Sequence, residues 1–571
     1  MSHDSSYRPM SAVERRSAEH QVFLAKMGVR TSQGSFYTPL DVAEHLISTA
    51  LADALSDMRE PEDCPFVLDP TCGTGNFLIV AALQLSERIG QLGLSDHDAL
   101  EFVINNRIFG TDLDDRAVYI CRQNLASLAP DSNCATRLSS HILQIDSLRL
   151  FLLGGGRAGQ GSLFDEPEPT WADVFPEAFV GDDPGFDAVV GNPPFLNQLE
   201  SETAISTELA TALIDRYGAT LSKLTNTASI FMLGASEIVN STGVISLIQP
   251  VSFLATRESA EVRRRLLQRG SLKELWFGGS GIFDAAVEIV GVTVTLKQSD
   301  NSTRISLGRA FESAGSVPSP TVEEGTWSRV LARARGVPHC EFASSGLLRE
   351  HANATADFRD QYYGLVGVVR ELGVGESCAG LLRLATVGLI DLAHFMWGER
   401  STKFAKEKFD NPVVDPKQLS DALRDWAESR SRPKVIVSNQ TKNLEVFVDT
   451  DGDILPSVPL LTVDCEAHKL WLVAAAIASP VASLVAAERH LGAGMSVDVL
   501  KLSAKDVLSL PVPIDLDAWA SGARAFEQLQ ACESSEERSD MFFEFASIMN
   551  SAYEVQNPMI ADWWLGRLPR R

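Results

Sequence analysis

Short apolar runs alternate with longer helical patterns through residues 34–304 of the chain. Each run ends at an acidic, amide or glycine position, and the runs occupy 66–69, 107–112, 142–146 and 186–191. Segments between them, such as 77–85 and 116–128, have the apolar spacing of helices. Buried strands that alternate with helices predict an α/β fold with a doubly wound, mostly parallel sheet. The polar residues that follow the runs should therefore meet at the carboxyl edge of that sheet.

The pattern changes after residue 304. Scattered turns between short apolar stretches predict a mixed α+β domain over 305–514, and helical spacing predicts a helical segment over 515–571. We also expect a helical extension over 1–33. The apolar run 471–487 is interrupted by Pro480 and is shorter than the ~20 residues that a membrane span requires. We interpret it as a buried helix.

Residues 154–185 separate the third apolar run from the fourth. Three glycines open this segment, and acids follow from Asp165 to Asp183 with no basic residue among them. This composition predicts a mobile acidic insert at the surface of the first domain. The alternative is that the insert docks a partner or keeps phosphate groups away from the wrong path.

Four residues, Asn192-Pro193-Pro194-Phe195, follow the fourth run directly. An exocyclic amine of adenine is a poor nucleophile because its lone pair is delocalised into the ring. The side-chain oxygen of Asn192 and the backbone carbonyl of Pro193 could accept its hydrogens, and the two prolines hold φ near about −65° so that these acceptors are preorganised. Phe195 could stack on the base and face the positive charge that develops as a methyl group arrives. The alternative is an ordinary proline turn at the end of a strand.

A glycine-containing loop, Asp69-Pro70-Thr71-Cys72-Gly73-Thr74-Gly75, follows the first run. It has neither the Gly-Lys-Ser/Thr of a phosphate-binding loop nor the complete dinucleotide fingerprint. A phosphate-free adenosyl ligand such as S-adenosylmethionine fits the loop better. Its glycines would let the backbone approach such a ligand closely.

Acids at the ends of the second and third runs extend this predicted ligand site. Asp112 is placed to accept from ribose hydroxyls, as strand-end carboxylates do in doubly wound folds. Asp114 could equally cap the helix that follows. Asp146 is suited to accept from the amino group of the donor's adenine, although a capping role is the simpler interpretation of its position alone.

The segment Gly34-Ser35-Phe36-Tyr37-Thr38-Pro39 precedes all of these motifs. Pro39 suits a first helical turn and Thr38 suits its cap. The aromatic pair before Thr38 could close over the methionine end of a donor lying on the glycine loop. The alternative is an ordinary helix entry.

In this order the motifs resemble those of the gamma-class, TaqI-like adenine-N6 DNA methyltransferases, which are related to modification subunits of restriction and phage-defence systems. The order runs from Gly34 through Asp69, Asp112 and Asp146 to Asn192, whereas the alpha and beta classes rearrange these blocks. The resemblance implies a Rossmann-like class I methyltransferase domain with S-adenosylmethionine as donor. It also implies transfer of a methyl group to the N6 amine of an adenine flipped out of double-stranded DNA.

The resemblance assigns roles to individual residues. The catalytic residues are Asn192, Pro193, Pro194 and Phe195. The expected cofactor-binding residues are Tyr37, Thr38, Asp69, Cys72, Gly73, Gly75, Asp112, Leu113, Asp146 and Asn192. Phe195 and Phe283 are expected to contact the flipped base, and Phe195 can replace the commoner tyrosine because stacking needs a ring and not a hydroxyl.

Composition limits these expectations. The chain has 571 residues, 45% of them hydrophobic, which indicates a globular protein of more than one domain. Its eight cysteines show no metal-ligand spacing, so we expect no metal site and reduced thiols in a cytoplasmic protein. The first thirty residues are polar and charged, unlike a secretory signal.

The formal net charge of −25 is unusual for a protein that binds phosphates. DNA binding would then depend on locally basic surface or on a partner, and its affinity should fall steeply with salt. In the second domain Arg and Lys suit guanine edges and Gln suits adenine, although the same side chains could contact phosphates instead. The candidates there are Arg400, Lys403, Lys434, Gln440 and Lys442.

Two other functions are compatible with the sequence. The same tetrapeptide would suit a methyltransferase that acts on RNA or on a glutamine side chain of a protein, although such enzymes are generally shorter. A non-catalytic DNA-binding subunit of a defence complex could also keep this fold. The sequence shows no nuclease motif, so a restriction partner is expected to be a separate chain.

Overall fold

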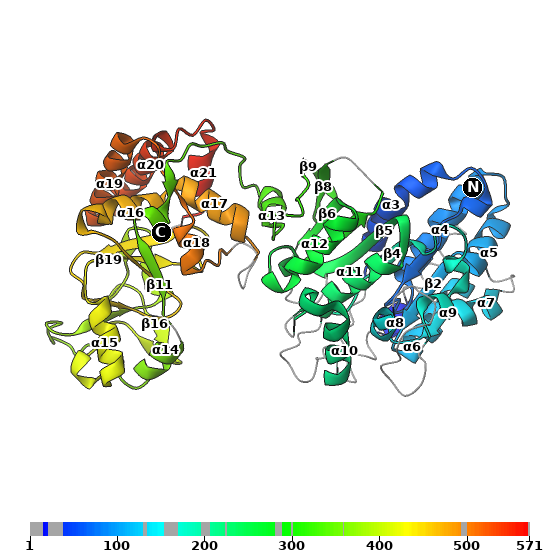
Figure 1. Ribbon diagram of the computed structural model, residues 1–571, viewed down its shortest axis with the longest axis horizontal. Coiled ribbons are helices and arrows are strands. Elements are labelled where there is room, and N and C mark those ends of the chain that lie inside the picture. Colours follow the sequence, from blue (N-terminus) through cyan, green and yellow to red (C-terminus); the bar gives the residue numbers. More distant parts are fainter. Residues whose placement is uncertain are drawn as a thin grey trace. The chain divides into compact units, whose positions relative to one another are not determined.

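The computed structural model divides the chain into two compact units, Met1–Val330 and Leu331–Arg571. It describes residues 15–20, 38–129, 134–153, 169–195, 206–222, 225–279, 282, 288–297, 301–357, 359–492 and 499–568. Figure 1 labels the elements of both units in chain order.

A nine-stranded sheet organises the first unit, with strand order β3-β2-β1-β4-β5-β7-β6-β8-β9. The first five strands in this order are parallel, and β7 runs antiparallel to both of its neighbours. The strands are β1 Val67–Asp69, β2 Ile108–Asp112, β3 Ile142–Gln144, β4 Phe186–Gly191, β5 Val239–Pro250, β6 Ser271–Gly279, β7 Ile289–Thr295, β8 Ser302–Leu307 and β9 Glu312–Pro318. The predicted α/β sheet is therefore confirmed.

Helices lie on both sides of this sheet, as in class I methyltransferases (Figure 1). They are α3 Leu40–Asp57, α4 Asn76–Gln91, α5 Asp96–Asn106, α6 Asp115–Ala126, α7 Cys134–His141, α8 Ser147–Leu153, α9 Trp171–Val174, α10 Thr207–Tyr217, α11 Thr227–Ile238 and α12 Ala260–Arg269. The apolar sides of α3 and α4 form one buried core with the strands β1, β2, β4 and β5. Because helices cover both faces of the sheet, the strand segments that precede the motifs are almost wholly apolar.

Strands β1 and β4 are neighbours although more than a hundred residues separate them in sequence. Val67 pairs with Ala188 and Leu68 pairs with Val189. Because the strands are parallel and in this register, the residues that follow them leave the sheet at the same edge. This pairing brings the glycine loop beside the Asn-Pro-Pro-Phe segment.

The described part of the predicted acidic insert is folded. Residues 154–168 lie outside the described residues, but 169–185 are folded, which corrects the expectation of a mobile insert throughout. Trp171 and Phe175 are both fully buried, and the Trp171 ring lies 5.2 Å from Phe151 and 6.3 Å from Phe186. The free energy of burying these large rings outweighs the repulsion among the acids around them.

The boundary between the predicted domains also needs correction. Strands β8 and β9 follow residue 301 and extend the large sheet, because β8 pairs with β6 and β9 pairs with β8. The first unit consequently ends at Val330 and not at residue 304.

Several smaller sheets form the second unit, which is the predicted mixed domain. One four-stranded sheet has the order β11-β22-β19-β20 and another has the order β12-β18-β13-β21. Its strands are β10 Gly346–Leu347, β11 Asn353–Ala356, β12 Arg370–Glu371, β13 Leu382–Ala385, β14 Ile390–Asp391, β15 His394–Phe395, β16 Thr402–Phe404, β17 Glu407–Phe409, β18 Pro412–Val414, β19 Lys434–Ser438, β20 Glu445–Asp449, β21 Ile454–Pro456, β22 Leu461–Asp464 and β23 Pro511–Val512.

Helices complete the second unit. After α13 Ser328–Ala334, which spans the boundary, they are α14 Arg359–Leu365, α15 Asp421–Arg430, α16 Leu470–Ala478, α17 Pro480–His490, α18 Ala504–Leu508, α19 Leu516–Ala531, α20 Ser535–Ala552 and α21 Met559–Leu565. The predicted helical segment after residue 514 therefore consists of α19, α20 and α21, and the Trp564 side chain is fully buried.

The apolar run around Pro480 is buried, as predicted, but it forms two helices, α16 and α17, where a single helix was expected, because Pro480 begins a new helix. Among the described residues, no helix is by itself long and apolar enough for a membrane span. Ala467–Ala478 and Pro480–His490 meet that test only when taken together, and the chain bends by 55° between them.

Replacement of Trp171 by alanine tests whether 169–185 belongs to the core. We expect a loss of about 3–5 kcal/mol in the free energy of unfolding, because the substitution leaves a cavity among Phe151, Phe175 and Phe186. Tyr119→Ala, at a side chain 60% exposed in the same unit, is the control and should change stability by less than about 0.5 kcal/mol. Denaturant unfolding measures both, and equal effects would contradict the assignment.

Candidate active site

Asp69 and Gly191 hold two strand ends together at the carboxyl edge of the sheet. Asp69 is 1% exposed, and its Oδ1 accepts from the backbone N–H of Thr71 at 2.9 Å. A Cβ placed on Gly191 would lie 2.5 Å from that same oxygen, and the φ of Gly191 is +148°. Only glycine fits this contact, because both the space and the backbone conformation exclude a side chain.

Burial raises the pKa of Asp69 to about 8, against the opposing effect of the hydrogen bond from Thr71. The neutral carboxyl is therefore favoured at pH 7. Asp69 was predicted to bind the cofactor, and that role stays a prediction, although its carboxyl lies against Gly191. Its observed role is to link the first residue of the glycine loop to the end of β4.

Three neighbouring elements, β2, α6 and α8, hold the backbone of the glycine loop. The N–H of Cys72 donates to the carbonyl of Thr111 at 2.9 Å. Side chains provide the other three contacts: Gly73 N–H donates to Asp112 Oδ2 at 2.8 Å, Asn124 Nδ2 donates to the Thr74 carbonyl at 2.9 Å, and Ser147 Oγ donates to the Pro70 carbonyl at 2.6 Å. The loop is thus preorganised before any ligand arrives.

The two glycines of the loop have different functions. A Cβ on Gly73 would meet no atom within 4 Å, so this residue leaves an open approach to the backbone. A Cβ on Gly75 would lie 2.6 Å from Cys121 Sγ, so this residue allows α4 to pack on α6. Both have positive φ, +51° and +93°.

Cys72 was predicted to bind the cofactor, but its thiol is buried in the core and lies beneath Gly110. Only its backbone faces the loop, because a 4% exposed side chain cannot reach a ligand above the loop. Binding of the cofactor by the backbone of Cys72 stays a prediction.

Asp112 ends β2 and Asp114 precedes α6, and these two acids have different roles. Asp112 accepts from the N–H groups of Gly73 and Asp114, and burial raises the pKa of its carboxyl. Asp114 caps α6 by accepting from the N–H groups of Arg116 and Ala117, which confirms the capping alternative. Leu113 between them is 66% exposed, an unusual position for a large apolar side chain.

Asp146 lies at the end of the third run and accepts from the N–H of Leu148 at 3.0 Å. It therefore caps the first turn of α8, which begins at Ser147. Capping was the simpler of its two predicted roles. Contact with a ligand's adenine stays a prediction for this residue.

Thr38 joins the glycine loop to the Asn-Pro-Pro-Phe segment. Its hydroxyl accepts from Asn192 Nδ2 at 3.1 Å, and its carbonyl accepts from Asn76 Nδ2 at 2.7 Å. Asn76 is the first residue of α4 and directly follows Gly75. Two side-chain contacts therefore connect the predicted donor loop with the predicted catalytic amide.

The remaining tetrapeptide residues lie at the same edge. Pro193 is buried, Pro194 is half-buried, and the half-buried Phe195 packs against the core of the first unit. Tyr37 and Phe283, the other aromatic residues predicted for this site, lie outside the described residues.

Sequence reasoning missed Asn76, Gly191 and Asn124. Asn76 carried a usable signal, because a polar residue that opens an apolar helix directly after two glycines suggests contact with a loop. Gly191 and Asn124 gave no signal, since their roles depend on the tertiary contacts with Asp69 and Thr74.

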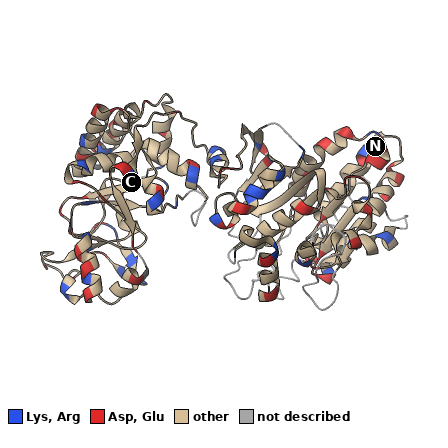
Figure 2. Cartoon of the chain, in the orientation of Figure 1, with Lys and Arg blue, Asp and Glu red and all other residues tan. Residues whose placement is uncertain are grey.

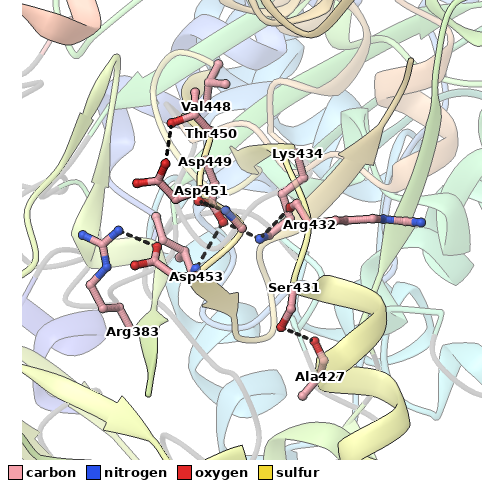
Figure 3. A network of polar contacts seen from close by, with 12 residues as sticks. Arg383, Ala427, Ser431, Arg432, Lys434, Val448, Asp449, Thr450, Asp451 and Asp453 are labelled. Carbon is pink, nitrogen blue, oxygen red and sulfur yellow. Dashed lines mark hydrogen bonds and ion pairs between the residues drawn. The ribbon is translucent and has the colours of Figure 1, made fainter. Parts of the chain in front are cut away.

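Lys434 was predicted to contact DNA, but the structure contradicts this. Its side chain is fully buried and forms an ion pair with Asp449, which also accepts from the N–H groups of Gly452 and Ile454 (Figure 3). Burial lowers the pKa of Lys434, against the opposing effect of Asp449. The pair links β19 to the turn after β20, so this ammonium group cannot reach a base.

The other predicted base readers differ in exposure. Arg400 donates to both carboxylate oxygens of Asp391, at 2.9 and 2.8 Å, so its guanidinium already has a partner. Gln440 is half-buried, whereas Lys403 and Lys442 are exposed. Figure 2 marks the positions of acidic and basic residues along the chain, and both kinds are interspersed in each unit.

Family models match the first unit. Residues 106–283 match the Eco57I restriction-modification methylase, and residues 39–141 match the RMKL-like methyltransferase domain. Both matches lie within the first unit, and each covers less than half of the chain. The predicted resemblance to restriction-modification methyltransferases is confirmed.

Among solved structures, the type IIL restriction-modification enzyme MmeI, solved with DNA, matches with a TM-score of 0.56 at 12% identity. That match covers 94% of this chain and 78% of the other, and it supports the fold. A modification subunit of a putative type I restriction enzyme from Vibrio vulnificus matches at 18% identity and a TM-score of 0.34. It covers 51% of each chain, and with this low score it adds nothing on the fold. No curated protein matches the chain.

Gly191→Ala tests the contact between the two strand ends. The new methyl group must displace Asp69 or the backbone that precedes Asn192. A misplacement of 1 Å at a catalytic group can reduce the rate of the reaction by about 100-fold. We expect a loss of methyl transfer of that order. Gly325→Ala is the control, because it lies in open space in the same unit. Equal activity of the two variants would contradict the contact.

Asp449→Asn tests the buried ion pair. Removal of one partner leaves the Lys434 charge buried without compensation, which should lower the free energy of unfolding by about 3–5 kcal/mol. The matched control is Asp421→Asn, because that carboxylate is 96% exposed and its pair with Arg424 is hydrated. Thermal unfolding should separate the two variants, and a base-reading role for Lys434 instead predicts unchanged stability.

Proposed function

We propose that this protein is a site-specific DNA methyltransferase that transfers the methyl group of S-adenosylmethionine to the N6 amine of adenine. The contact of Thr38 with both Asn192 and Asn76 is the observation that carries this proposal. It brings the acceptor for the amine to the loop that would hold the donor. The match to a restriction-modification methylase model supports the same reaction class.

The loop fits the proposed donor. Gly73 offers an open backbone position, Asp112 is already oriented by two N–H groups, and the exposed side chain of Leu113 could cover an adenine ring. Asp112 would accept from ribose hydroxyls through its remaining lone pairs. When bound, S-adenosylmethionine supplies an electrophilic methyl group on a sulfonium centre.

Asn192 would orient the attacking amine. Because its nitrogen donates to Thr38, the carboxamide is turned so that its oxygen is the acceptor for an amine hydrogen. This contact localises the nitrogen lone pair toward the methyl group, and the Pro193 carbonyl would accept the second hydrogen. Phe195 would stack on the extruded base. The amine proton can leave after the methyl group has been attached, so a strong base is not required.

We further propose that the protein provides the modification activity of a restriction-modification or phage-defence system. MmeI, which shares the fold, is a restriction-modification enzyme whose structure was solved in complex with DNA. In this proposal the second unit recognises the DNA sequence.

Substitutions at Asn192 and Thr38 test the proposed reaction. Asn192→Ala should abolish methyl transfer to DNA while donor binding stays measurable, because the amide would contact the base and the rest of the donor loop is intact. Thr38→Val removes the acceptor that orients the amide, and we expect a loss in kcat of about 10- to 100-fold. The assay follows labelled methyl groups into duplex DNA, RNA or protein, with donor binding measured by calorimetry.

The outcome separates the candidate functions. Label in RNA or protein would identify a different acceptor. A parent protein that binds DNA and donor but transfers nothing would instead indicate a non-catalytic subunit. Equal transfer by Asn192→Ala and the parent would contradict the proposed mechanism.

A further inference from the structure

Strands β16 and β17 form a short hairpin whose connection is conformationally unfavourable. The two residues between the strands, Ala405 and Lys406, have φ values of +50° and +72°. A two-residue hairpin connection with positive φ at both positions normally uses asparagine or glycine, because a Cβ is disfavoured there. Here neither residue is of that kind.

The surrounding structure stabilises this connection. The N–H of Ala405 donates to the hydroxyl of Tyr362 at 3.1 Å, and the Tyr362 ring lies 4.7 Å from that of Phe404. Phe404 and Phe409 are buried in one core cluster of the second unit. One face of the hairpin is therefore anchored, and its shape is maintained at a cost in backbone strain.

Three cations lie on the hairpin, and two of them are on the face opposite the buried Phe404 and Phe409. Lys403 and Lys408 pair directly across the strands, and Lys406 lies at the turn. Like charges in directly opposite positions repel each other. All three side chains are exposed, and within the described part of the chain none of them forms an ion pair.

This concentration of charge contrasts with the rest of the protein. The chain has 75 acidic and 50 basic residues, whereas the hairpin Thr402–Phe409 has three lysines and one acid, Glu407. Elsewhere many basic side chains already have partners. Arg400 binds Asp391, Lys434 binds Asp449, and Arg263 donates to the carbonyls of Thr256 and Gly325. The hairpin backbone is strained, its lysines repel each other, and they form no ion pair within the described residues. These features together indicate that the lysines bind an anionic ligand on another molecule.

We propose that the β16–β17 hairpin binds the phosphate backbone of duplex DNA. The proposal rests on the proposed function for its partner and assigns Lys403, predicted from sequence as a possible base reader, to phosphate contact. Lysine is a compact point charge with rotatable donors, which suits phosphate oxygens more than the fixed pattern of a base edge. The hairpin thereby supplies positive charge that the acidic chain as a whole lacks.

The main test neutralises the three cations in the full-length protein with Lys403→Gln, Lys406→Gln and Lys408→Gln together. Each phosphate contact releases counterions and contributes about 0.9 to the slope of log K against log salt, so the slope should fall in magnitude by roughly 2–3. At about 0.1 M salt, duplex affinity should fall roughly 10- to 100-fold. The loss should be equal for duplexes of unrelated sequence and should appear in KM for DNA, not in donor affinity.

The charge-matched control is Lys417→Gln, Lys501→Gln and Lys505→Gln. These three lysines are also exposed in the second unit and form no ion pair within the described part of the chain. The control should retain the parent's affinity and salt slope. A similar loss in both triple variants would show a general effect of net charge and would overturn the proposal.

A second pair of variants separates charge from conformation. Lys406→Gly and Ala405→Gly each relieve an unfavourable φ, so both should raise the melting temperature or leave it unchanged. Only Lys406→Gly removes a cation, so it alone should weaken duplex binding, by roughly 5-fold at about 0.1 M salt. A purely structural role for the hairpin predicts instead that affinity follows stability in both variants.

The outcomes distinguish this inference from the proposed function. If the parent methylates DNA and the triple variant binds every duplex equally well, the hairpin proposal fails and the function stands. If the parent binds DNA through these lysines but transfers no methyl group, the function fails and the proposal stands. Losses confined to one DNA sequence would indicate base reading, and failure of the parent to bind duplex DNA would overturn both.

Discussion

The parallel pairing of β1 with β4 is the constraint on which the candidate active site depends. It places Asp69 directly beneath Gly191, so that the glycine loop and the tetrapeptide leave the sheet at one point. Glycine is required there because a Cβ would lie only 2.5 Å from the carboxyl oxygen of Asp69. A buried, predominantly neutral carboxyl can remain at this position without an ionic partner, which explains how an acid fits inside the core.

Around this contact the protein uses short polar side chains to join segments that are distant in sequence. Thr38 precedes α3, Asn76 opens α4 and Asn192 follows β4, yet two hydrogen bonds connect all three. Asp112, Asn124 and Ser147 similarly hold the loop backbone from three other segments. Each bond satisfies a buried polar group and also restricts a loop that would otherwise be mobile. Stability and preorganisation of the site therefore have the same physical origin.

The second unit uses charge differently at its interior and at its surface. Lys434 and Asp449 are buried together and fasten a turn to a strand, so a basic residue in this acidic chain serves the fold. On the β16–β17 hairpin, by contrast, three lysines are exposed although two of them lie directly opposite each other. A count of basic residues in the sequence cannot distinguish these two uses, because the difference lies in burial and in the partner that tertiary structure provides.

The sequence by itself determined the α/β class of the first unit, the order of its motifs and the positions at which its strands end. These follow from local rules: apolar runs form buried strands, and glycine, proline or acids end them. It also indicated the capping role open to Asp114. Only the tertiary structure decided that Asp69 and Cys72 are buried, that 169–185 is folded and that Lys434 is inaccessible. Burial depends on neighbours from distant parts of the chain, and a linear pattern of residues does not specify which neighbours those are.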